Sequence, residues 1–331
     1  MPQAYSLPKP NYFLAPRMAS EHISKKRKTR CKDLHSNAFR AKEEDVWFDD
    51  GNIVLVAEDT PFRVHKGVLA AKSEIFRDTF SVPQPEYDDL LDGIPILRLL
   101  DNWVDVRNML VGMYHSDRYL ELKDGMEFSV VKSFSCLGTK YEVKAIRQEA
   151  IKRLRRCYPT SFKRYLAQAV EHVHPIKMTP TDAMEAVHIA RLCDLPDILP
   201  SAFYQCTRLS MQKLLEGPQS SLISTSDLRA ILEGRRKLAI SSIIFLKDMM
   251  LKSPAIGCMS PDDCSREIRN GLSRVWDDLV ETAGDLASEY HTVKLMGDST
   301  CVSCALSLEW ECERYYQETW DRLGEYFNVR P

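Results

Sequence analysis

The hydrophobic pattern changes its period within residues 53–80, and this change limits the possible folds more than any other feature of the chain. Residues 53–56 form an apolar run rich in β-branched side chains, and residues 62–65 alternate between apolar and polar side chains. Both patterns predict strands, and the turn residues between them predict a hairpin. From Gly67 to Phe80 the apolar residues recur at helical spacing, which predicts a single helix with one broad apolar face.

Further along the chain, the apolar spacing predicts one more strand and then only helices. Ile94, Ile96 and Leu97 indicate a short strand near Pro95. Helices are predicted from Trp103 to Tyr114, over 128–137 and 143–154, and near 160–172, 181–193, 199–215, 226–252, 263–290 and 302–327. No strand is predicted beyond residue 140. We therefore expect an α+β domain followed by an all-α region.

The residues of this first part resemble the opening of a BTB/POZ domain. The pattern is an apolar strand, then F-x-x-H-[KR]-x-x-L, a pair of small residues, S-x-x-F and a further F. Its positions here are Phe62, His65, Lys66, Leu69, Ser73, Phe76 and Phe80. Tyr114 and residues 138–141 match later family positions, so the resemblance covers residues 45–145. It implies a short mixed sheet flanked by helices, and a non-catalytic module that pairs with itself or with a related BTB chain.

Two positions depart from what the resemblance implies. The family usually carries an acidic residue where this chain has Asn52, and that residue and the base at Lys66 line a charged pocket in dimeric members. Asparagine keeps the hydrogen bonding but loses the charge, so the co-repressor groove of transcriptional members is not favoured. Residues 84–86 match poorly the motif with which other members bind cullins, and cullin binding stays an alternative.

The rest of the chain is similar to BTB proteins of basidiomycete fungi. The similarity rests on residues 199–204, on 227–228 with 233–235, and on 320–327. It implies a helical extension over residues 146–331 and no established activity.

The first 40 residues are rich in Pro, Ser, Lys and Arg and show no sustained period, which predicts a disordered tail. Residues 25–30 within it form a basic cluster of the kind that import receptors or phosphates bind. The formal net charge of −2 gives no overall field for nucleic acid, and no segment has the length and apolarity of a membrane span. We expect an intracellular protein of the nucleus or cytoplasm, without membrane or nucleic-acid binding as its main role.

Three functions from different classes fit these features. The first is an interaction module, scaffold or adaptor that forms a homodimer or a related pair through the BTB fold. The second is a nuclear, transcription-related regulator whose basic tail contacts DNA. The third is a substrate adaptor for a cullin-type ubiquitin ligase.

Two pairs of cysteines near the C-terminus form a candidate metal site. Cys258 and Cys264 are separated by five residues, and Cys301 and Cys304 by two. Two close pairs of thiolates are a common way to hold structural zinc, although the five-residue spacer is wider than usual, and Cys312 could substitute as a ligand. Four protein ligands would leave no open position, so the metal would stabilise the fold and perform no catalysis. The alternative is that these cysteines are small buried hydrophobes, as we expect for Cys136, Cys157, Cys193 and Cys206.

The familiar enzyme motifs are missing from the sequence. It contains no phosphate-binding loop, no dinucleotide fingerprint, no nucleophile elbow and no H-E-x-x-H. The resemblance to BTB domains implies that His65 lies at a strand-to-helix junction, where its nitrogens satisfy backbone groups. We therefore expect no enzymatic activity and no catalytic residue.

Overall fold

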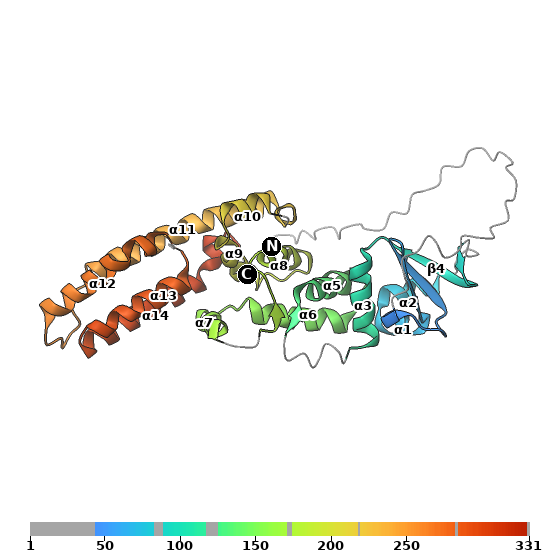
Figure 1. Ribbon diagram of the computed structural model, residues 1–331, viewed down its shortest axis with the longest axis horizontal. Coiled ribbons are helices and arrows are strands. Elements are labelled where there is room, and N and C mark those ends of the chain that lie inside the picture. The colour runs from blue at the N-terminus through green and yellow to red at the C-terminus, as the bar shows by residue number, and fades with distance from the viewer. Residues whose placement is uncertain are drawn as a thin grey trace, which may run out of the picture. The chain divides into compact units, whose positions relative to one another are not determined.

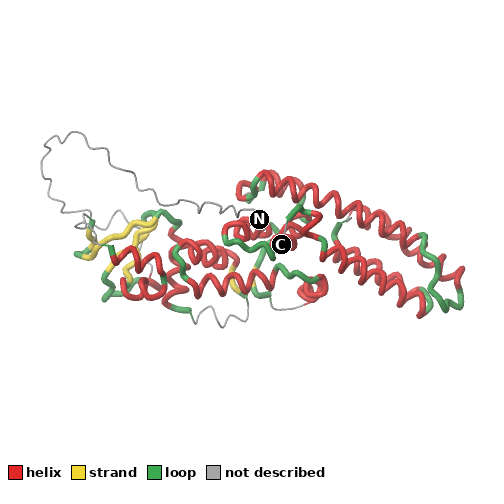
Figure 2. The backbone as a smooth tube through the Cα atoms, turned by 180° about the vertical axis from the view of Figure 1, so that it is seen from behind, coloured by secondary structure: helices red, strands yellow, loops and turns green. Residues whose placement is uncertain are grey.

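The structure, a computed structural model, describes residues 44–82, 89–116, 125–170, 174–217, 219–281 and 284–329. The predicted disordered tail and its basic cluster lie outside these residues, as do residues 84–86. In Figure 2 the strands lie mainly in the first part of the chain, and helices dominate the rest.

The first part contains a small sheet with helices beside it (Figure 1). Its elements are η1 (Glu44–Val46), β1 (Ile53–Ala57), β2 (Thr60–Val64), α1 (Lys66–Lys72), α2 (Glu74–Ser81), β3 (Leu90–Leu91), β4 (Ile94–Leu99), α3 (Trp103–Tyr114), β5 (Met126–Glu127), α5 (Phe128–Lys140) and α6 (Lys144–Cys157). The strand order is β2-β1-β4-β3. β1 pairs with β2 antiparallel and with β4 parallel. The sheet is therefore mixed, as predicted, and every residue of β1 is buried.

The second part is largely helical, which confirms the predicted α+β domain followed by a helical region. Its elements are α7 (Phe162–Val170), β6 (Ile176–Lys177), α8 (Asp182–Leu192), α9 (Leu199–Thr207), α10 (Met211–Glu216), η2 (Ser220–Leu222), α11 (Thr225–Met250), α12 (Pro261–Glu281), α13 (Leu286–Leu295), η3 (Met296–Ser299), α14 (Val302–Asp321) and α15 (Leu323–Tyr326). In the part of the chain that the structure describes, each helix is too short or too polar to cross a bilayer.

The prediction that no strand lies beyond residue 140 is wrong. Residues 176–177 form β6, which pairs in parallel with β5 through Met126 and Ile176. The guanidinium of Arg153 on α6 donates to the carbonyl oxygen of Pro175 at 2.9 Å, directly before this strand. A two-residue strand is too short to produce an alternating pattern, and its pairing depends on a partner 50 residues away. Through these contacts, β6 of the helical region is bound to β5 and α6 of the first part of the chain.

The predicted helix from Gly67 to Phe80 is also wrong, because the chain forms two helices there. Ser73 has an extended backbone with φ of −136°, and its hydroxyl accepts a hydrogen bond from the backbone N–H of Phe76. This is the ordinary N-cap arrangement of serine, so α2 begins as a separate helix after α1.

Three other predicted helices are divided in the same way. The predicted helix at 199–215 forms α9 and α10, and the hydroxyl of Ser210 caps the second. The predicted helix at 263–290 forms α12 and α13, with Gly284 between them at a φ of +96°, which favours glycine. The predicted helix at 302–327 forms α14 and α15. In all three cases the apolar spacing continues across the break, so a periodic pattern alone does not reveal it.

Gly234 on α11 provides a test of how tightly the helical region is packed. A Cβ atom at this position would lie 2.2 Å from ring atoms of Phe327, a buried residue that also packs on Phe203. We expect Gly234→Ala to lower the free energy of unfolding by about 2 kcal/mol, because overpacking outweighs the better helix propensity of alanine. Urea denaturation measures this change.

Gly67 on α1 is the matched control, since a Cβ atom there meets no other atom within 4 Å. Gly67→Ala is expected to raise stability by roughly 0.5 kcal/mol. Equal effects of the two substitutions would contradict the close approach of α11 to Phe327.

Candidate functional sites

The start of α1 is held by a group of polar and aromatic side chains. The side-chain oxygen of Asn52 accepts a hydrogen bond from the backbone N–H of Lys66 at 2.8 Å. The hydroxyl of Tyr114 accepts the backbone N–H of His65 at 2.9 Å. Two N–H groups at the beginning of the helix, which lack partners within the helix, are thus satisfied by side chains from distant parts of the sequence.

His65 lies at the predicted strand-to-helix junction, but its ring does not contact backbone groups as expected. Nδ1 lies 3.3 Å from the hydroxyl of Tyr114, and Nε2 lies 3.1 Å from a carboxylate oxygen of Asp50. The hydrogen bond with His65 is the main reason why the pKa of Asp50 is lowered. Phe48 stacks on the ring of Tyr114 with centroids 4.6 Å apart. The ring of His65 therefore joins side chains of two other segments, residues 48–50 and the end of α3.

The other signature residues form the packed interior behind α1 and α2. Phe62, Leu69 and Phe76 are buried, and the ring of Phe76 stacks in parallel on Tyr141 at 4.9 Å. The Ser73 hydroxyl donates to the carbonyl oxygen of Tyr141 at 2.5 Å. Phe80 is half-buried and stacks on Phe76, with centroids 5.9 Å apart. These positions hold the two short helices against the end of α5.

Four cysteines of the helical region come together at one place. Cys258 lies in the loop after α11, Cys264 in the first turn of α12, Cys301 at the N-cap of α14 and Cys304 in its first turn. Their sulfur atoms all lie within 4.8 Å of one another. The Sγ atoms of Cys258 and Cys301 are 3.7 Å apart. Zinc–sulfur bonds of about 2.3 Å in a tetrahedron place the sulfurs about 3.8 Å apart, so this spacing fits a metal ion.

The surroundings of the sulfurs favour a thiolate at Cys301 only. Desolvation raises the pKa of Cys258 to about 12 and also raises the pKa of Cys304. Two helices begin at the cluster, and the positive end of a helix stabilises negative charge. Backbone N–H groups of Ala255 and Cys301 donate to the sulfurs of Cys304 and Cys264, each at 3.4 Å. A hydrogen bond from the backbone of Cys304 is the main reason why the pKa of Cys301 is lowered to about 7. Backbone donors of this kind commonly orient and stabilise metal ligands.

The remaining cysteines of the described segments lie outside this group, and all but one of them are buried. Cys312, the predicted substitute ligand, is buried in the apolar core and lies outside the group of four. Cys157, Cys193 and Cys206 are buried as expected, whereas Cys136 is only half-buried. Burial raises the pKa of Cys312, Cys136 and Cys157 to about 12, which keeps these thiols protonated.

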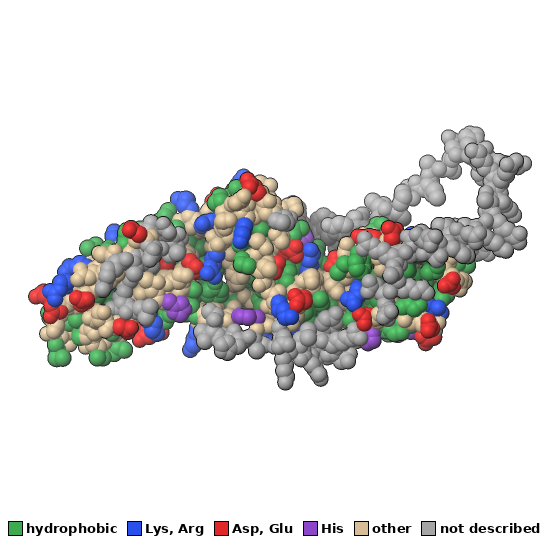
Figure 3. All heavy atoms as spheres, in the orientation of Figure 1, with side chains coloured by type: hydrophobic (Ala, Val, Ile, Leu, Met, Phe, Trp, Pro, Cys, Tyr) green, Lys and Arg blue, Asp and Glu red, His purple; other side chains and the backbone are tan. Residues whose placement is uncertain are grey.

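α6 carries four basic residues close together, Lys152, Arg153, Arg155 and Arg156, and three of them pair with carboxylates. Arg155 pairs with Asp197 at 2.6 Å, and Arg153 pairs with Glu149 at 2.7 Å. On the face shown in Figure 3, acidic and basic side chains are interspersed over the visible elements. This pattern fits a solvated helix side better than a phosphate-binding stripe.

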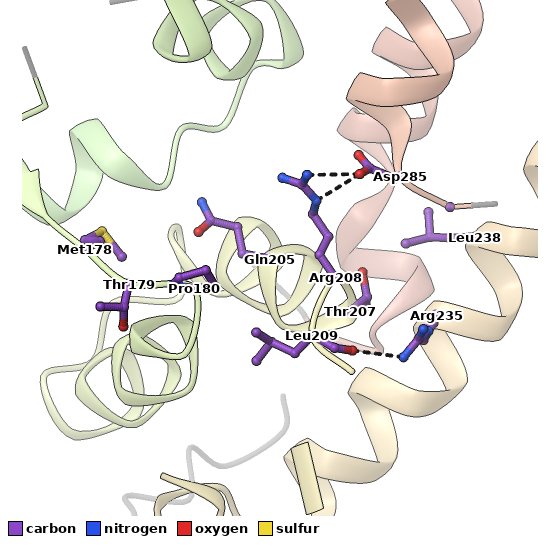
Figure 4. A pocket seen from close by; sticks show the side chains of 11 residues that line it. Met178, Thr179, Pro180, Gln205, Thr207, Arg208, Leu209, Arg235, Leu238 and Asp285 are labelled. Carbon is purple, nitrogen blue, oxygen red and sulfur yellow. Dashed lines mark hydrogen bonds and ion pairs between the residues drawn. The ribbon is translucent and has the colours of Figure 1, made fainter. Parts of the chain in front are cut away.

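A cavity of about 550 Å³ opens between α9, α11 and the loop before α13. Figure 4 shows Arg208 pointing at Asp285 and Arg235 pointing at the backbone of Leu209. Arg208 contacts the Asp285 carboxylate through two nitrogens, at 3.1 and 3.0 Å, and its third nitrogen donates to the hydroxyl of Tyr165. Since these charges largely satisfy one another, the contacts fix the end of α9 to the start of α13.

Comparison with known proteins agrees with the geometry of the first part of the chain. Residues 49–156 match the family model of the BTB/POZ domain. No curated protein matches the sequence, and the similarity of the remaining residues to fungal proteins stays a prediction. The matched range begins just before β1 and ends one residue before the end of α6. Residues 49–156 therefore form a BTB/POZ domain, a protein-interaction fold with a small mixed sheet and helices, and a largely helical region follows it.

Proposed function

We propose that this protein is a non-catalytic interaction module that pairs through its BTB domain with a second copy or a related chain, while the helical region binds a further partner. The match of residues 49–156 to the BTB/POZ family carries this proposal. Isologous pairs are the most frequent form of oligomer, and their surfaces are often apolar. The mass of the purified chain in solution, measured by light scattering, tests it, since a monomer would contradict the pairing.

The β3–β4 side of the sheet offers an apolar surface for this pairing. β1 is fully buried, whereas all six residues of β4 are at least partly exposed, and four of them are Ile or Leu. Leu90 on β3 is 56% exposed, and Leu100 directly after β4 is 100% exposed. Leu90 pairs with Pro95 near the start of β4, whereas Leu100 follows the other end of this strand, so the exposed apolar side chains are spread along the β3–β4 side. An exposed apolar strand edge is typical of a surface that a partner covers.

A charge at Leu100 is expected to weaken the pair. Leu100→Asp should raise the dimer dissociation constant about tenfold or more, because a carboxylate would be buried against apolar groups. Leu251→Asp is the matched control, since this leucine is also largely exposed but lies after α11 in the helical region. Analytical ultracentrifugation measures both constants. An unchanged constant for Leu100→Asp would remove the β3–β4 side as the pairing surface.

We also propose that Cys258, Cys264, Cys301 and Cys304 bind one structural zinc ion. The sulfur spacing, the two helix N-termini and the backbone donors support this proposal. The ion would tie the loop between α11 and α12 to the start of α14 and would leave no coordination position for a substrate. Its role would be to stabilise the end of the helical region.

A further inference from the structure

A second cavity in the helical region has a different chemical character from the one that contains Arg208. It has a volume of about 720 Å³ and lies between the start of α9, the end of α14 and α15. The last helix, α15, packs against α9 in this part of the molecule. Trp320 and the prolines Pro159, Pro196 and Pro200 form much of its wall. Proline has no N–H group, so this wall is apolar and rigid.

All the charged side chains that line this cavity are acidic. Among the residues of its wall, every one of which the structure describes, are Asp197, Asp321 and Glu325 but no lysine, arginine or histidine. The volume is within the range of about 300–1,000 Å³ that small ligands and side chains occupy in binding sites. A cationic group is therefore the ligand that the charges of this wall favour.

The three carboxylates are not equally available. Asp197 accepts two hydrogen bonds from Arg155 and adjoins the positive end of α9. Among the described residues, Glu325 forms an ion pair with the exposed Arg322 three residues before it, a type of contact that contributes little. Asp321 accepts a hydrogen bond from the amide of Gln317 at 2.7 Å. Asp321 also lies at the C-terminal, negative end of a 20-residue helix, which adds to the attraction for a cation.

A buried hydroxyl in the same wall lacks a partner. Ser201 on α9 lines the cavity and is only 2% exposed. Its Oγ atom has no hydrogen-bond partner among the described residues. Buried hydroxyl groups are nearly always hydrogen-bonded. The Oγ atom is enclosed in this conformation, so an N–H group of a ligand would pair with it after the side chain rotates toward the cavity.

We propose that this cavity binds an arginine or lysine side chain of a partner protein. The aliphatic stem of such a residue would pack on the prolines and Trp320, and its cationic head would reach Asp321 and Glu325. The inference rests on the proposed role of the helical region as a binding surface, and it is independent of pairing through the BTB domain.

The test uses the full chain and two acetylated, amidated peptides, Gly-Ala-Arg-Ala-Gly and the same peptide with citrulline in place of arginine. Citrulline keeps the shape of arginine without its charge. Surface plasmon resonance should show that the arginine peptide binds at least about tenfold more tightly. In the double variant Asp321→Asn, Glu325→Gln, this preference should disappear. Asp262→Asn, an exposed carboxylate on α12 outside the cavity, is the control and should leave it unchanged.

Ser201→Ala separates a ligand-binding role from a structural one. Removal of an unpartnered hydroxyl should leave the melting temperature unchanged or raised, while the affinity for the arginine peptide falls about threefold.

Equal binding of the two peptides, or full binding by the double variant, would overturn the proposal. Light scattering on the same samples keeps the two proposals apart, since a monomer that binds arginine contradicts only the pairing, and a dimer that does not bind it contradicts only the cavity.

Discussion

Cys301→Ser is expected to abolish the binding of one equivalent of zinc and to lower the melting temperature by about 10 °C. The substitution removes a sulfur that lies 3.7 Å from Cys258 and stands at the N-cap of α14. Three ligands would remain, and the loop after α11 would no longer be joined to α14. Metal content by mass spectrometry and calorimetric unfolding on the same sample measure the two effects.

Cys312→Ala is the matched control for this substitution. Cys312 lies on the same helix and is fully buried, but it does not belong to the group of four sulfurs. The variant should lose stability through a small packing defect and keep its zinc. A chelator should lower the melting temperature of the native chain and of Cys312→Ala but not that of Cys301→Ser. The metal site would be refuted if the native chain contained no zinc and its melting temperature did not change with the chelator.

The BTB part could be predicted from the sequence because its signature residues stand at fixed offsets within a short segment. The break between α1 and α2 could not, because Leu69, Phe76 and Phe80 continue a helical period across it. Ser73 ends the first helix partly through its hydrogen bond to the carbonyl oxygen of Tyr141, which is 68 residues away. A contact of that sequence separation leaves no trace in a local pattern.

The cysteine cluster could be predicted in part, and the cavities could not. The pair Cys301 and Cys304 is recognisable from its local spacing, and its partners follow from the rule that structural zinc has four ligands. The acidic cavity has no comparable signal. Its wall combines Pro159, Asp197 and Asp321, which come from three separate segments, and only the fold brings them together. Likewise, no spacing in the sequence indicates that the ring of His65 joins Tyr114 and Asp50.

A buried carboxyl in the helical region gives the protein a pH-dependent stability. Glu289 on α13 is fully buried, and its carboxyl accepts the backbone N–H of Gly284 at 2.6 Å and the hydroxyl of Tyr316 at 3.4 Å. Burial raises its pKa from 4.5 to about 7, because the charged form loses its hydration, and the nearby Asp285 adds to the shift. The folded state therefore binds a proton between these two values that the unfolded state does not.

Glu289→Gln is expected to remove this dependence. In the native chain the contribution of Glu289 is fully present below pH 4.5 and is lost as the pH rises through about 7, a loss on the order of 3 kcal/mol. The difference in unfolding free energy between the native chain and Glu289→Gln should therefore shift by that amount in favour of the variant between pH 4.5 and pH 8. Urea denaturation at several pH values measures it.

The exposed Glu313 on α14 provides the comparison. Glu313→Gln leaves the buried carboxyl in place, so the pH dependence of the native chain should persist in this variant. If the difference in unfolding free energy between the native chain and Glu289→Gln stays constant from pH 4.5 to pH 8, Glu289 has the same pKa in the folded and the unfolded protein. Burial among α11, α13 and α14 would then not be the cause of any pH dependence, and water would have to reach the carboxyl in the folded state.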